Sequence, residues 1–135
     1  MIRVVLDTNV YLSGIIFGGK PKTILTLTRR SQLKNYTSPK ILLELSQKLQ
    51  QKFLWSTQDI QNALKAISMS STLVKPTISL SVVHEDPTDN KILECAETAK
   101  ADFVITGDKH LLNLKKWKST EIVTPSEFIV RFLSL

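Results

Sequence analysis

Cysteine, glycine and long apolar runs are all scarce in this chain of 135 residues. The single cysteine, Cys95, cannot form an internal disulfide, which is typical of proteins from a reducing cytoplasm. The apolar runs are too short to cross a bilayer, and Arg3 and Asp7 bracket the first one, which argues against a secretory signal. We therefore expect a cytoplasmic protein that does not enter a membrane.

A glycine-rich phosphate-binding loop is also missing. The stretch from Gly14 to Lys20 matches the first part of a P-loop, but Pro21 stands where a hydroxyl residue would hold Mg²⁺. Acidic residues are in the minority, because 18 Lys and Arg outnumber 12 Asp and Glu and leave a net charge of +6. This excess modestly favours a polyanionic partner such as nucleic acid.

The order of the predicted elements indicates an α/β fold. At 42% hydrophobic residues the chain can form one core, and we expect one domain over residues 1–135. Buried parallel strands alternate with helices, so a mostly parallel twisted sheet with helices on both faces follows. We predict strands at 2–6, 35–37, 102–106 and 121–123, extended segments at 73–74 and 79–83, and helices at 8–17, 21–33, 39–53, 57–70, 86–100, 111–114 and from 125 onward.

Two of the predicted strands end in an aspartate. Asp7 follows the first strand, and Asp108 follows the strand at 102–106 after Gly107. The carboxyl ends of parallel strands form the crevice in which such sheets bind ligands. Aspartate at this place also caps helices, so each residue alone has a purely structural interpretation. As a pair, the two carboxylates favour a site for Mg²⁺ or Mn²⁺, which prefer oxygen ligands.

Two further acids could join this pair. Asp89 follows Asp86 and Pro87 at a predicted helix start, where Asp86 is the better cap and Asp89 could project toward the crevice. Glu44 interrupts an apolar run of leucines, which places it at the edge of a buried helix face. Its structural alternative is a surface ion pair with Lys48, four residues later.

Three blocks of sequence together resemble the PIN-domain nucleases over essentially the whole chain. The first is Leu6-Asp7-Thr8-Asn9, and the second is Ser38-Pro39 followed by Leu43-Glu44-Leu45. The third and most specific block consists of Asp86-Pro87-Thr88-Asp89-Asn90, Ala96, Ala101-Asp102, Val104-Ile105-Thr106-Gly107-Asp108 and Leu111-Leu112. The compact length and the closing Val123-Thr124-Pro125-Ser126-Glu127-Phe128 resemble the PIN toxins of toxin–antitoxin pairs.

This resemblance implies a metal-dependent endoribonuclease in which Mg²⁺ or Mn²⁺ is held by Asp7, Glu44, Asp89 and Asp108, with Asn9 and Thr106 in support. It also implies RNA as substrate, an antitoxin protein as partner and a homodimer. Clustered carboxylates repel one another, and a divalent cation relieves that repulsion while it polarises a phosphodiester.

Two other functions stay open from the residues alone. A metal-dependent phosphatase could begin with the same strand and aspartate, but Asn9 stands where its general acid is needed. A nucleic-acid-binding module without catalysis would use its basic residues and keep the acids only as helix caps.

Overall fold

A six-stranded sheet organises the protein, whose computed structural model describes residues 1–83 and 87–134. The strand order is β3-β2-β1-β4-β6-β5, and every neighbouring pair is parallel except β5 with β6. The strands are β1 (Arg3–Leu6), β2 (Lys34–Thr37), β3 (Thr72–Leu73), β4 (Phe103–Ile105), β5 (Lys116–Trp117) and β6 (Thr120–Val123).

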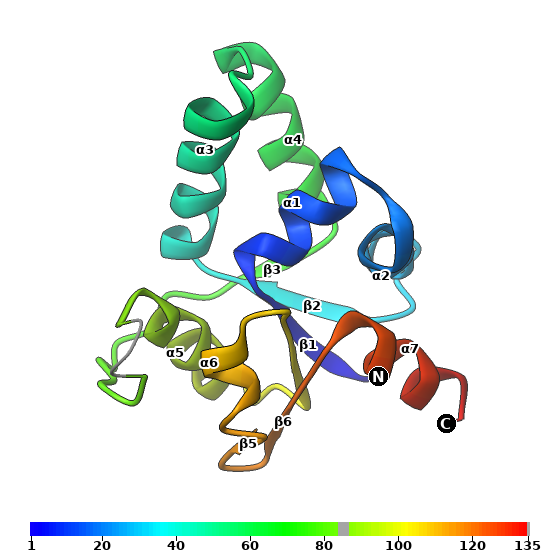
Figure 1. The fold of residues 1–135 in the computed structure, drawn as a ribbon, viewed down its shortest axis with the longest axis vertical. Helices are drawn as coiled ribbons and strands as arrows, with labels where there is room; N and C mark the ends of the chain where they lie inside the picture. Colours follow the sequence, from blue (N-terminus) through cyan, green and yellow to red (C-terminus); the bar gives the residue numbers. More distant parts are fainter. Residues whose placement is uncertain (84–86, 135) are drawn as a thin grey trace.

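Helices cover both faces of this sheet (Figure 1). They are α1 (Thr8–Ile16), α2 (Gly19–Arg29), α3 (Pro39–Phe53), α4 (Thr57–Met69), the 3₁₀ helix η1 (Pro87–Asp89), α5 (Asn90–Ala99), α6 (Lys109–Leu112) and α7 (Pro125–Leu133). Helices α1, α3 and α4 lie on one side of β1 and β2, and α5 packs on the other side against β1, β2 and β4. Among the helices of the described ranges, none combines the length and apolar character needed to cross a bilayer.

The predicted α/β fold with its mostly parallel sheet is confirmed. Helix α3 illustrates how the sequence determines where an element begins and which face it buries. Ser38 accepts a hydrogen bond from the Ile41 N–H at 3.4 Å, and Pro39 occupies the first helical turn. Ile41, Leu45 and Leu49 recur at every fourth position and are fully buried. Glu44 therefore lies beside the buried stripe, as its place among the leucines predicted.

Three details of the structure differ from the sequence predictions, add to them or lie outside the described residues. The segment 79–83, predicted as extended, belongs to no β-strand, and its N–H groups at Leu80, Val82 and Val83 donate to side chains of α5. The antiparallel strand β5 was not predicted, and at two residues it is too short to show a periodic pattern. Asp86, predicted as a helix cap, lies outside the residues that the structure describes.

Candidate functional site

Asp7 and Thr106 lie side by side where β1 and β4 end. The sheet pairing continues past both strands, since the Asp7 N–H donates to the Ile105 carbonyl at 3.0 Å and the Thr106 N–H to the Val123 carbonyl at 2.9 Å. The Thr106 hydroxyl, fully buried, donates to Asp7 Oδ2 at 2.7 Å. The parallel sheet thus brings together two side chains that are 99 residues apart in the chain.

The Asp7 carboxyl is buried at a place where its charge is unfavourable. Its pKa is raised above the usual value, chiefly because burial removes water from the carboxylate. The hydrogen bond from Thr106 lowers the pKa, whereas the negative charges of Glu44 and Asp108 raise it further and the ammonium of Lys48 lowers it. Glu44 and Asp108 are therefore near enough to act electrostatically on Asp7.

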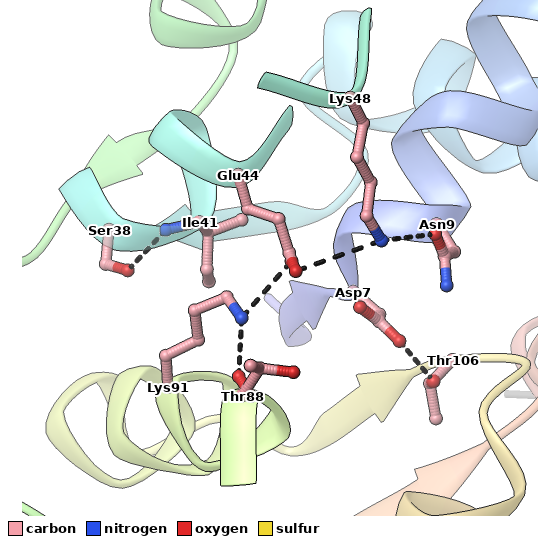
Figure 2. A network of polar contacts seen from close by, with 9 residues as sticks. All are labelled: Asp7, Asn9, Ser38, Ile41, Glu44, Lys48, Thr88, Lys91 and Thr106. Atoms are coloured by element: carbon pink, nitrogen blue, oxygen red, sulfur yellow. Dashed lines mark hydrogen bonds and ion pairs between the residues drawn. The ribbon is translucent and has the colours of Figure 1, made fainter. Parts of the chain in front are cut away.

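Asp7 occupies the N-cap position of α1, but its side chain makes no capping hydrogen bond to that helix. The Asp7 side chain therefore does not act as a helix cap, which was the purely structural interpretation of this residue. Its carboxylate instead turns toward Thr106 and the ends of the strands (Figure 2).

Asp108 joins the same group through the backbone and also caps a helix. Its N–H donates to the Thr106 hydroxyl oxygen at 2.9 Å, so a single hydroxyl connects Asp7 with Asp108. Its Oδ1 accepts a hydrogen bond from the His110 N–H at 2.7 Å, which caps the short helix α6. The capping interpretation is correct for this residue, and it fixes the carboxylate beside the strand ends.

Glu44 reaches the site from α3 and is held there by two lysines (Figure 2). Lys91 Nζ of α5 lies 3.2 Å from Glu44 Oε1, and Lys48 Nζ of α3 lies 3.8 Å from Glu44 Oε2. Lys48 also donates to Asn9 Oδ1 at 3.1 Å, which ties the first turn of α1 to α3. The predicted Glu44–Lys48 pair is present, and it belongs to a larger network next to Asp7.

Asp89 lies at the junction of η1 and α5 and is buried, with an exposed fraction of 7%. Its side chain makes no capping hydrogen bond to α5. Two residues later Lys91 contacts Glu44, so the start of α5 faces α3 across the site. The structure therefore links Asp7 to Asp108 through the Thr106 hydroxyl, and Lys48 links Glu44 to Asn9. Asp89 lies two residues before Lys91, and its membership in the group stays a prediction.

A hollow of about 500 Å³ opens between α3, the start of α5 and the segment 79–81. Glu44 and Lys91 line it, so the hollow adjoins the carboxylates. The other described residues that line it are mostly polar and include no aromatic side chain: Lys40, Leu43, Gln47, Ser79, Leu80, Ser81, Thr88, Asn90 and Glu94.

Buried polar side chains of α5 hold one wall of this hollow. Asn90 Oδ1 accepts hydrogen bonds from the N–H groups of Val82 and Val83, both at 2.9 Å. Glu94 Oε2 accepts from the Leu80 N–H at 2.9 Å. The segment 79–83 is therefore fastened to α5 by two side chains.

The donor chemistry of the carboxylates suits Mg²⁺ or Mn²⁺, which bind through oxygen. Within residues 1–83 and 87–134, however, no three His, Cys, Asp or Glu side chains are arranged to hold one ion. Both oxygens of Glu44 face lysine ammonium groups in this structure. The carboxylate repulsion that acts on Asp7 is the kind that a divalent cation relieves, so these residues fit such an ion.

The sequence profile of the PIN domain matches residues 3–110, which include all of the acids described above. The chain belongs to the PIN domain family. A relative in Methanocaldococcus jannaschii, the uncharacterized protein MJ1680, is 38% identical over 97% of this chain and 92% of its own length. The predicted family is thereby confirmed, and with it the relation to nucleases.

Two solved structures share the fold at low sequence identity. VapBC2 from Rickettsia felis, solved bound to a DNA fragment from its promoter, superposes with a TM-score of 0.64 at 14% identity and covers 91% of this chain and 98% of that one. PAE2754 from Pyrobaculum aerophilum gives a TM-score of 0.64 at 16% identity and covers 99% of this chain and 91% of that one. These two structures confirm the fold that the sequence predicted.

Lys91 is the residue of this site that the sequence did not reveal. It is one of many lysines in a basic chain, and no spacing distinguishes it from those on the surface. Its low side-chain exposure, 13%, appears only when α3 and α5 are placed together. Its position two residues after Asp89 was the one available indication.

Proposed function

We propose that this PIN-domain protein is an endoribonuclease that depends on Mg²⁺ or Mn²⁺, and that it is the toxin of a toxin–antitoxin pair. The observation that carries the proposal is the buried Asp7 carboxylate at the end of β1, linked through Thr106 to Asp108 and acted on by the charge of Glu44. Negative charges concentrated at the carboxyl end of a parallel sheet are unfavourable for the empty fold and useful to a cation-dependent reaction.

Each residue has a definable part in this proposal. Asp7, Glu44, Asp89 and Asp108 would hold the cation, which when bound supplies Lewis acidity toward the phosphodiester and toward water. Thr106 fixes the orientation of Asp7 by its hydrogen bond, and the cap on α6 fixes Asp108. Asn9 keeps Lys48 beside Glu44.

The surroundings of the carboxylates support a nucleic-acid substrate. The chain carries a net charge of +6, and Lys40 and Lys91 line the hollow beside Glu44. Polyanions are attracted to such a surface, and one linkage can then reach the carboxylates. Hydroxyl groups of Ser79, Ser81 and Thr88 in the same hollow can hydrogen-bond ribose as well as phosphate.

The toxin assignment and its partners rest on family likeness. The Rickettsia felis structure of the same fold is a VapBC complex, and we propose that a corresponding antitoxin binds this chain. A homodimer remains a prediction, which light scattering on the purified protein tests directly.

The decisive experiment incubates mixed RNA with the purified protein in Mn²⁺ or Mg²⁺, with EDTA and the Asp7→Asn variant as controls. Cleavage is expected with either metal, and its absence in both controls. The new ends should be 5′-phosphate and 3′-hydroxyl, since the attacking group is water. A 2′,3′-cyclic phosphate would contradict the proposal, and binding of RNA without any cleavage would identify a binding module instead.

A further inference from the structure

Two lysines beside Glu44 are unusually withdrawn from solvent. The side chains of Lys91 and Lys48 are 13% and 24% exposed, whereas Lys40, which pairs loosely with Glu94 at 3.9 Å, is 74% exposed. A lysine ammonium is strongly hydrated, so its removal from water needs compensating partners. The withdrawal of two of them to the same carboxylate is therefore a specific feature of the site.

Those partners are oxygen atoms on several elements. Lys48 reaches Glu44 and the side-chain oxygen of Asn9, and Lys91 reaches Glu44 and the backbone carbonyl of Thr88 (Figure 2). Each ammonium group thus has oxygen acceptors on two sides. Their two positive charges offset part of the negative charge of Asp7, Glu44 and Asp108.

This arrangement conflicts with a divalent cation on Glu44. Both Glu44 oxygens face ammonium groups, at 3.2 Å and 3.8 Å. A cation coordinated there would repel both ammonium groups at short range, since like charges disfavour one another. The ion pairs of both lysines with Glu44 would then have to break. Lys91 already lines the hollow beside Glu44, so its ammonium group can turn into that hollow.

We propose that Lys48 and Lys91 are exchangeable counter-cations of Glu44, which hold this carboxylate before the metal binds and contact substrate phosphate once the metal has taken it. The inference rests on the proposed function, because it takes Glu44 as a metal ligand. It makes metal binding and RNA binding mutually dependent, with each strengthening the other by the same factor.

The first test measures Mn²⁺ binding to the full chain by titration calorimetry. Lys91→Met removes a competing charge, so Mn²⁺ affinity should rise roughly two- to five-fold, the upper part of the range measured for single ion pairs. Lys48→Met should act in the same direction. Lys40→Met is the matched control in the same hollow, and its Mn²⁺ affinity should stay within about two-fold of the wild type. Thermal unfolding in EDTA verifies that each variant is folded.

The second test measures binding of a single-stranded phosphorothioate RNA by fluorescence anisotropy, with Mn²⁺ and with EDTA. The wild type should bind this RNA more tightly in Mn²⁺, and Lys91→Met should lose most of that gain. Unchanged or weaker Mn²⁺ binding by both lysine variants would overturn the inference. If the wild type still cleaves RNA in that case, the proposed function stands and only the exchange fails; if the wild type neither binds Mn²⁺ nor cleaves, the proposed function itself fails.

Discussion

Thr106 donates its buried hydroxyl to Asp7 at 2.7 Å, and through that contact the two central strands fix the orientation of a carboxylate that no helix cap restrains. The same hydroxyl oxygen accepts the Asp108 N–H at 2.9 Å. One small polar side chain therefore sets the relative positions of two acids from opposite ends of the sequence.

Replacement of Thr106 by valine should impair cleavage more than it impairs folding. The variant keeps the shape of the side chain but loses the donor to Asp7 and leaves the Asp108 N–H without its acceptor. We expect a loss of about 1–3 kcal/mol in unfolding free energy. Cleavage should fall roughly 10–100-fold, as for other residues that orient metal ligands.

Thr120→Val is the matched control for that variant. Thr120 is also a buried threonine, and its hydroxyl donates to the Ala101 carbonyl near the opposite ends of the strands. It should lose similar stability in denaturant titrations and retain its cleavage rate. Equal losses of activity in both variants would show that Thr106 acts only on the fold.

Asp7→Asn should stabilise the protein at neutral pH when no metal is present. Because the folded state raises the Asp7 pKa, protonated Asp7 contributes stability that is full below the unfolded value of 3.8 and is lost as pH rises through the folded pKa. Asparagine does not ionise and still accepts the Thr106 hydrogen bond. Thermal unfolding in EDTA should therefore show a higher Tm for the variant at pH 7 and a gap that closes toward pH 3.8.

Divalent metal should make the wild type more stable than Asp7→Asn, the reverse of the Tm order expected in EDTA. The reason is that Mg²⁺ or Mn²⁺ stabilises only a chain that binds it. Addition of either ion should raise the Tm of the wild type more than that of Asp7→Asn. A difference between the two proteins that is constant across pH and metal concentration is the result that contradicts this prediction.

Asn90→Ala should loosen the segment 79–83 without removing the carboxylates. The buried Asn90 Oδ1 accepts hydrogen bonds from the N–H groups of Val82 and Val83, and alanine leaves both without this partner. Amide hydrogen exchange should accelerate at these two positions, with about 1–3 kcal/mol lost from local stability. Asn62→Ala, on the exposed surface of α4, is the control and should leave exchange at 82 and 83 unchanged.

The sequence was sufficient for the fold and for the places of Asp7, Glu44 and Asp108 in it, because its strongest signals are local. Asp7 and Asp108 follow short strands that contain β-branched residues. The parallel pairing of β1 with β4 brings the ends of these strands together. The leucine spacing of α3 predicted the edge position of Glu44, and Ser38 capped that helix as its sequence indicated.

The parts that were not predicted depend on contacts between distant elements. Lys91 meets Glu44 only because α5 and α3 face each other at one end of the sheet. The extended segment 79–83 was predicted, but its attachment was not: the N–H groups of Leu80, Val82 and Val83 donate to the side chains of Glu94 and Asn90. Side-chain hydrogen bonds of this kind leave no periodic trace in a sequence.

We propose above all that carboxylates at the strand ends hold a divalent cation, and that the protein needs this cation to hydrolyse RNA. The most direct measurement compares wild type and Asp108→Asn for RNA cleavage in Mn²⁺ and for binding of the same RNA in EDTA. We predict that the variant binds RNA as the wild type does, keeps its α6 cap through the asparagine oxygen, and loses cleavage. Equal cleavage by a folded Asp108→Asn protein would contradict it.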